Sequence, residues 1–111
     1  MTDDKVRMAR TEALFRDVNE RIAESAERFD CDEATFVCEC ADGSCTERVD
    51  ASLADYEEVR AEPTRFLLAP GHEDQRVERV VQRRPDFAVV EKFGEVVARI
   101  VRNLDPRADL A

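Results

Sequence analysis

Three of the chain's four cysteines lie within eight residues, in the stretch FVCECADGSC that runs from Phe36 to Cys45. Cys38, Cys40 and Cys45 have the spacing C-x-C-x4-C, and Cys31 precedes them by seven positions. Thiolates are ligands for zinc, which takes four sulfur or nitrogen donors in a tetrahedral arrangement. Residues i and i+2 of a strand point to the same face, so Cys38 and Cys40 could reach one ion. The spacing therefore predicts a zinc knuckle that supplies three of the four ligands.

Two residues could supply the fourth ligand. His72 is the single histidine and directly follows Pro70-Gly71, a pair that suits positions i+1 and i+2 of a type II turn. Such a turn could carry the imidazole to the cysteines. Cys31 is nearer in the sequence and could bind the ion instead, or could be a small buried apolar residue. The predicted metal ligands are Cys38, Cys40, Cys45 and His72, with Cys31 as the alternative fourth ligand.

Other uses of the cysteines fit the sequence less well. The first residues, MTDDKVRMARTEALF, lack the basic start and apolar run of a secretory signal. We therefore expect a cytoplasmic protein whose thiols stay reduced, which argues against disulfides. The C-x-x-C runs usual in iron–sulfur proteins do not occur. A catalytic thiol would need an adjacent base such as His72, but three neighbouring thiols favour a metal, and we expect no enzyme.

Composition narrows the classes of partner. Charged residues make up 39% and hydrophobic residues 43% of the chain, as in a globular domain with a solvated surface. No apolar run is long enough for a membrane span, so we expect no membrane partner. The formal net charge of -9 argues against a nucleic-acid partner, because nucleic-acid binding needs a positive surface.

A helix is predicted over residues 4–29, because apolar residues recur there at helical spacing and form one face. We expect this face to cover the core. Its pattern is also similar to the seam of a short coiled coil, so a homodimer through the helix is the second interpretation. The face consists of Phe15, Val18, Ile22 and Phe29, widened by Leu14 and Ala26. Three acid-before-arginine pairs at i,i+4 could add ion pairs along the helix: Glu12–Arg16, Asp17–Arg21 and Glu24–Arg28.

A small antiparallel sheet is predicted over residues 35–93. It starts with a hairpin that turns at Asp42-Gly43 and carries the cysteines at its tip. A helix over 53–61 is inserted after Ser52, the predicted N-cap. The further strands are predicted over 65–69, 77–82 and 87–93.

Residues 94–104 could form a terminal helix or a strand, because valines and an isoleucine recur at helical spacing but favour strands. Residues 105–111 read as a tail. The chain 1–111 is thus predicted to be a single α+β domain with an N-terminal helix, a small antiparallel sheet and a zinc knuckle.

The C-x-C-x4-C spacing resembles the post-SET zinc knuckle of SET-domain methyltransferases, in which three clustered cysteines bind zinc with a fourth from a distant segment. This resemblance covers eight residues. It implies that the spacing can hold zinc, and nothing about methyl transfer, because the chain is too short for a SET domain.

Most of the chain resembles an uncharacterised family of small proteins of actinobacteria and their relatives. That family's pattern includes the three clustered cysteines and the histidine but not Cys31, which implies His72 as the fourth ligand. It implies no activity. The segments that carry the resemblance are EALFRDVNERI (12–22), FVCECADGSCTER (36–48), YEEVRAEPTRF (56–66), APGHE (69–73) and FAVVEK (87–92).

Together these observations predict a small zinc-binding protein with a structural metal site. Its expected role is a protein-interaction or regulatory module for an unknown protein partner. One alternative is a thiol-based redox or zinc-release sensor, in which oxidation of the thiolates ejects the metal. The other alternative is a nucleic-acid-binding zinc ribbon, which the net charge disfavours.

Overall fold

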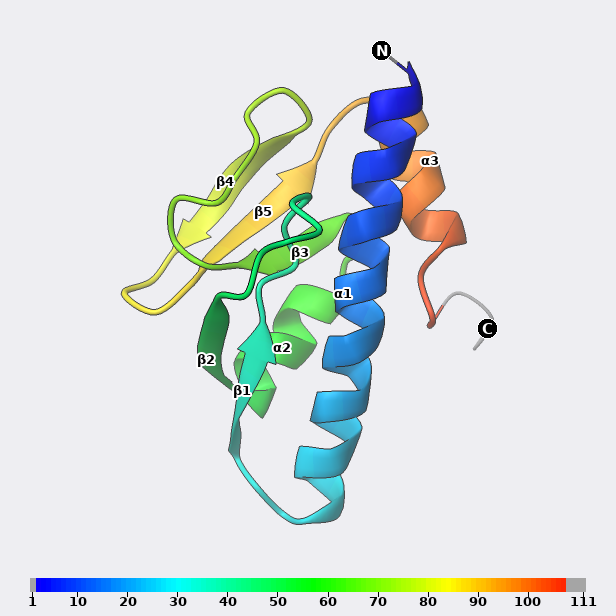
Figure 1. The fold of residues 1–111 in the computed structure, drawn as a ribbon. Helices are drawn as coiled ribbons and strands as arrows, with labels where there is room; N and C mark the ends of the chain where they lie inside the picture. Colours follow the sequence, from blue (N-terminus) through cyan, green and yellow to red (C-terminus); the bar gives the residue numbers. More distant parts are fainter. Residues whose placement is uncertain (1, 108–111) are drawn as a thin grey trace.

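A computed structural model describes the chain from residue 2 to residue 107, with side chains from residue 4 onward (Figure 1). The fold is α+β, with an N-terminal helix and small antiparallel sheets, as predicted. No helix within residues 2–107 is long and apolar enough to cross a membrane. In chain order the elements are α1 (Thr2–Arg28), β1 (Glu33–Val37), β2 (Arg48–Ser52), α2 (Leu53–Arg60), β3 (Arg65–Leu68), β4 (Glu78–Arg83), β5 (Ala88–Lys92) and α3 (Glu95–Asn103).

The strands form two separate sheets rather than the one sheet predicted over 35–93. β1 and β2 make an antiparallel hairpin whose last pair before the cysteines is Val37 with Arg48. The other sheet has the order β3-β5-β4 and is antiparallel throughout. Just after β1, the N–H of Glu39 donates to the carbonyl of Leu67 in β3 (2.8 Å). The N–H of Leu67 donates to the Glu39 carboxylate (2.9 Å) and not to a backbone carbonyl. The backbone pairing between the two segments therefore does not extend into a ladder.

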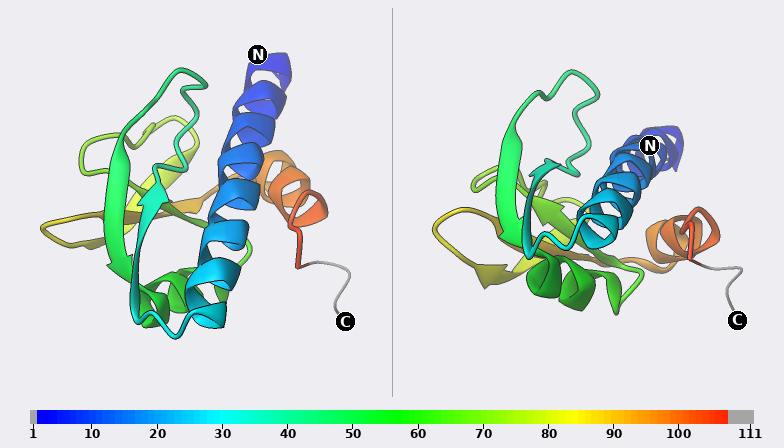
Figure 2. Two further views of the ribbon diagram at one scale, coloured as in Figure 1. Left: turned by 60° about the horizontal axis from the view of Figure 1, so that its bottom comes forward. Right: turned by 90° about the horizontal axis from the view of Figure 1, so that it is seen from below.

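The long helix α1 lies along the molecule and contacts β1, α2 and α3 (Figure 1). α3 lies beside the N-terminal half of α1 in every view, and α2 packs between β2 and β3 (Figure 2). The core lies between these elements and includes the stacked rings of Phe36 and Tyr56, whose centroids are 4.5 Å apart. Ser52 caps α2 as predicted, because its side chain accepts a hydrogen bond from the N–H of Asp55 (3.0 Å).

α1 turns a different face to the core from the one predicted. Three residues of the predicted apolar face are exposed: Leu14 by 62%, Val18 by 41% and Phe29 by 72%. The alanines on the buried face of α1 allow the strands to approach closely. The polar side chains on this face form hydrogen bonds or ion pairs with the segments that pack against them. Tertiary packing has therefore overridden the hydrophobic pattern. The buried residues of α1 are Ala9, Glu12, Ala13, Arg16, Asn19, Glu20, Ala23 and Ala26.

Glu12 pairs with the strands and not with Arg16, so that predicted ion pair is wrong. Its carboxylate contacts the ammonium of Lys92 in β5, which also contacts Glu78 in β4. All three side chains are at most 1% exposed. Burial raises the pKa of Glu12 to about 8, although Lys92 opposes the rise. One lysine thus pairs with two buried carboxyl groups, which join α1 to the three-stranded sheet.

Arg16 is also buried and joins α1 to β3. Its guanidinium donates to the carbonyl of Pro63 (2.8 Å) and to that of Arg65. The same group lies 3.6 Å from the centroid of the Phe66 ring, within range of a cation–π contact. Arg16, predicted to pair with Glu12 along the helix, is therefore part of the interior.

Residues Glu95–Asn103 form the helix α3, which decides between the two predicted alternatives for 94–104. The helix follows Gly94, whose φ of 91° lies in the left-handed region that favours glycine. Val97 and Val101 are buried on one side of α3, which packs against α1. Contact with α1 thus outweighs the strand preference of the β-branched residues.

The first residues of the predicted tail are held in place. Asp105 is buried and pairs with Arg60, and Arg107 pairs with Glu20 of α1. Hydrogen bonds from Arg60 and from the N–H of Arg107 lower the pKa of Asp105 despite its burial, which acts in the opposite direction. Residues 108–111 lie outside the described part of the chain.

Candidate metal centre

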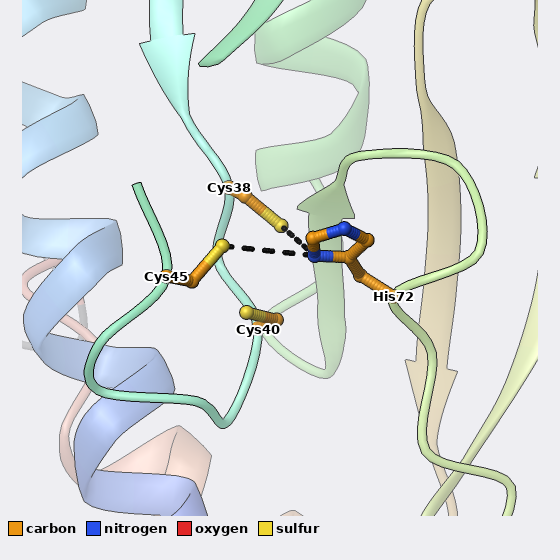
Figure 3. A group of neighbouring side chains, drawn as sticks. All are labelled: Cys38, Cys40, Cys45 and His72. Carbon is orange, nitrogen blue, oxygen red and sulfur yellow. Dashed lines mark hydrogen bonds between the residues drawn. The ribbon is translucent and has the colours of Figure 1, made fainter. Parts of the chain in front are cut away.

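Four side chains from two distant segments meet at the tip of the β1–β2 hairpin (Figure 3). They are the predicted ligands Cys38, Cys40, Cys45 and His72. One ligand atom from each lies within 4.8 Å of all the others, close enough for them to hold a metal ion. The side chains point toward a common centre between the hairpin tip and the turn after β3 (Figure 3).

The backbone just after β1 positions the first two thiols. The N–H of Cys38 donates to the carbonyl of Glu47 (3.1 Å), so the hairpin continues one step beyond the last strand pair. Cys38 and Cys40 are both buried, at 2% and 3% exposure. Glu39 between them points to the opposite side, as expected for an extended segment. The two thiols therefore share a face, as the C-x-C spacing predicts.

A tight turn returns the third thiol to the first two. The N–H of Cys45 donates to the carbonyl of Asp42 (3.0 Å). The Asp42 carboxylate accepts hydrogen bonds from the hydroxyl (2.7 Å) and the N–H (2.9 Å) of Ser44. These side-chain bonds stabilise the same turn. These bonds lower the pKa of Asp42, so the carboxylate that stabilises the turn is ionised at neutral pH.

The turn after β3 delivers the imidazole. The N–H of His72 donates to the carbonyl of Ala69 (3.2 Å), and Gly71 has a φ of 85°, as position i+2 of a type II turn requires. The Nδ1 atom of His72 lies 3.6 Å from the Sγ atoms of both Cys38 and Cys45. The predicted Pro-Gly turn thus places the ring nitrogen beside the thiols.

The measured separations fit a tetrahedral ion. With zinc–sulfur bonds of about 2.3 Å and zinc–nitrogen bonds of about 2.0–2.1 Å, tetrahedral angles put sulfur and nitrogen about 3.6 Å apart. The two Sγ–Nδ1 distances are 3.6 Å. The two sulfur–nitrogen pairs therefore already have the spacing that such an ion needs, and the Cys40 thiol lies within 4.8 Å of the other three ligand atoms.

The surroundings of the buried sulfurs suit a cation. Burial raises the pKa of Cys38 and Cys40, so the two thiols would keep their protons at neutral pH unless a positive charge lay beside them. One feature already favours the thiolate form: the N–H of Ala69 points at the Sγ atom of Cys38 (3.1 Å). A metal ion at the centre would supply the remaining stabilisation.

Glu39 is the positioning residue that the sequence analysis missed. It is completely buried between the two cysteines, and its carboxylate accepts from Leu67 N–H (2.9 Å) and from the Asn19 amide (2.8 Å). Burial raises the pKa of Glu39, and the nearby Arg16 opposes the rise. The sequence does contain a signal for this role. Side chains alternate between the two faces of an extended segment, so the middle residue of C-E-C points away from the cysteines and into the protein.

Cys31, the alternative fourth ligand, is not brought to this centre. It is exposed and lies in the loop before β1. The metal centre lies beyond the other end of that strand, and the seven residues from Cys31 to Cys38 span roughly 20 Å when extended. The direction of β1 therefore separates the two positions.

Comparison of the chain with family models, with curated proteins and with solved structures gave no match. The resemblances to the post-SET knuckle and to a family of small actinobacterial proteins stay predictions. The candidate metal centre rests on the geometry of the chain itself.

Proposed function

We propose that the chain is a small zinc-binding protein whose metal site is structural. The observation that carries this proposal is the convergence of three thiols and one imidazole, with all ligand atoms within 4.8 Å of one another. Thiolates are soft ligands, and a four-donor set of sulfur and nitrogen is typical of tetrahedral zinc.

The number and origin of the ligands support a structural role. Four protein ligands complete a tetrahedron, so no position is left for a water molecule or a substrate. Three ligands come from the hairpin tip and the fourth comes from the turn between β3 and β4. A bound ion would tie the two sheets together, which is the work of a fold-stabilising site and not of a catalytic one.

A module stabilised in this way would act through its surface. We infer a protein-interaction or regulatory role, no enzymatic activity, and a cytoplasmic location where the thiols stay reduced.

Elemental analysis of protein purified without added metal tests the proposal. We expect close to equimolar zinc. Thiol titration should find Cys31 reactive, and Cys38, Cys40 and Cys45 protected until a chelator is added. Protein without zinc, whose four thiols all react freely, would refute a zinc site.

A pair of variants tests the ligand set. His72→Ala removes a ligand and should weaken zinc retention in a chelator competition. Cys31→Ser, the matched control, removes an exposed thiol outside the centre and should retain zinc like the original chain. Equal zinc retention by both variants would exclude His72 as a ligand.

One observation favours a second candidate function, a redox or zinc-release sensor. Cys45 is only half-buried, whereas Cys38 and Cys40 are buried, so oxidants reach one ligand of the centre more easily than the other two. A sensor should release zinc at low peroxide doses and recover it on reduction. A purely structural site should hold its zinc at the same doses.

A further inference from the structure

α1 and the turn residue directly after it present an apolar stripe, which we define as Leu14, Val18, Ile22 and Phe29. Leu14, Val18 and Phe29 are exposed and Ile22 is half-buried. Their spacings of four, four and seven residues place them along one side of the helix. That side lies apart from the alanine-rich face that packs on the strands. Of the four residues, Ile22 also packs against the edge of the core, whereas Leu14, Val18 and Phe29 are exposed.

A row of alternating charges flanks the stripe. Asp17, Arg21, Glu24 and Arg28 are all exposed. Within residues 4–107, none of them forms an ion pair, although the i,i+4 spacing predicts pairs between them. The order along the chain is acid, base, acid, base, and the spacings of four, three and four are symmetric about their midpoint. Reversing such a row places every charge opposite one of the other sign.

We propose that a second copy of this chain covers the stripe, with the two α1 helices antiparallel about a two-fold axis near Ile22. In an antiparallel pair the same flank of each helix meets its counterpart, because the two-fold rotation reverses the chain direction. Asp17 then lies opposite Arg28 of the partner copy, and Arg21 lies opposite the partner's Glu24. The row of charges is therefore self-complementary, as a two-fold interface requires.

The apolar residues agree with the register that the charges set. Pairing position 17 with position 28 also pairs position 29 with position 16, midway between positions 14 and 18. The Phe29 ring thus fits between Leu14 and Val18 of the partner copy. Ile22 meets Ile22 of the partner next to the axis. Ridges of one helix enter gaps of the other, as in coiled-coil packing.

The charge pattern also explains why the occupant is a copy of the chain. A net charge of -9 opposes self-association in general, but the flanking row holds two acids and two bases and is locally neutral. A parallel helix pair would bring opposite flanks together and leave this row unpaired. The dimer does not depend on zinc binding, so the test of the dimer and the test of the metal centre are independent.

Sedimentation of the full chain over a concentration series tests the dimer. We expect the mass to rise from one chain to two, and Phe29→Asp to weaken association about tenfold or more. Val96→Asp is the matched control, because Val96 is an exposed apolar residue on α3 outside the stripe and its change should leave association as it was. A chain that stays monomeric throughout, or a Phe29→Asp variant that dimerises normally, would overturn the proposal.

A charge exchange tests the register. Arg28→Asp puts two acids opposite each other at both ends of the row and should weaken the dimer about tenfold. The double variant Asp17→Arg/Arg28→Asp exchanges the partners and should restore association. Circular dichroism should show both variants folded, because both positions are exposed. Failure of the double variant to recover would overturn the antiparallel pairing.

Discussion

Glu39 and Leu67 bond to each other twice, once through the backbone and once through the Glu39 side chain. The N–H of Glu39 donates to the Leu67 carbonyl (2.8 Å), and the N–H of Leu67 donates to the Glu39 carboxylate (2.9 Å). The other carboxylate oxygen accepts from the amide of Asn19 (2.8 Å), which is itself fixed by two bonds to the backbone of Val37. One buried side chain thus joins the segment between two candidate metal ligands to β3 and α1.

The first prediction concerns Glu39→Gln. Glutamine keeps the size of the side chain but turns one acceptor into a donor that faces the Asn19 amide. Asn19 cannot rotate to compensate, because Val37 holds both ends of its amide. We expect the free energy of unfolding in urea to fall by about 1–3 kcal/mol, the cost of an unpaired buried polar group. We also expect weaker zinc retention in chelator competition.

Glu47→Gln is the control for this substitution, because Glu47 is exposed beyond the cysteines. It should leave the unfolding free energy within about 0.5 kcal/mol of the original value. Equal effects of the two substitutions would mean that Glu39 does not position the hairpin tip.

The second prediction concerns metal removal. Chelation should lower the melting temperature, because a ligand bound only by the folded state stabilises that state. Amide hydrogen exchange should rise most in the hairpin tip, 38–47, and in the turn 69–74, which the ion would tie together. Exchange in the middle of α1 should change least, since Lys92 and Phe66 hold it to the strands. A uniform rise over the whole chain would contradict a local tie.

The third prediction is a pH dependence of stability that comes from Glu12. Burial raises the pKa of this carboxyl from 4.5 to about 8 in the folded chain, against the opposing effect of Lys92. The unfolded chain therefore releases this proton at a lower pH than the folded chain does. The stabilisation is complete below pH 4.5 and is lost as the pH rises toward 8, above which this group adds no further slope.

Urea unfolding over a pH series checks this dependence. Glu12→Gln removes the titrating group, so its unfolding free energy should fall less than that of the original chain between pH 4.5 and 8. Glu27→Gln is the control, because Glu27 is exposed on the same helix and lies outside the apolar stripe and its charge row, and it should keep the original slope. The same slope in the Glu12→Gln variant would assign the pH dependence to other groups.

The fourth prediction concerns Lys92, the shared partner of Glu12 and Glu78 in the interior. Lys92→Met leaves both carboxyl groups buried without a cation, so we expect a loss of about 3–5 kcal/mol in unfolding free energy. Adding Glu12→Gln should recover part of that loss, because one unpaired carboxyl is then removed. A neutral effect of Lys92→Met alone would mean that Lys92 does not stabilise the buried carboxyl groups.

The candidate metal centre could be predicted closely because its determinants are local. The C-x-C spacing sets the first two thiols on one face. The Asp42 turn and the Pro70-Gly71 turn each depend on a few neighbouring residues. These turns form in the structure and bring the predicted ligands within 4.8 Å of one another. Cys31 lies in the loop before β1, at the end of that strand away from the centre. This separation follows from the direction of β1, but only once the bounds of the strand are known.

The faces of the helices could not be predicted in the same way. The strongest apolar pattern on α1 includes Val18 and Phe29, which are exposed, whereas Arg16 and Asn19 are buried. A periodic pattern says which side of a helix is apolar but not which side has partners. For α1, Pro63 and Val37 supply backbone partners to those buried polar groups.

The sequence by itself determined the α+β class, the cap of α2, the turns that shape the hairpin tip, and the residues that gather there. Each of these depends on backbone preferences and hydrogen bonds that span only a few residues. The tertiary structure alone decided which face of α1 is buried, where Glu39 and Lys92 find their partners, and that residues 95–103 are helical. Those features depend on burial and on charges from distant segments, and such contacts exist only after the chain has folded.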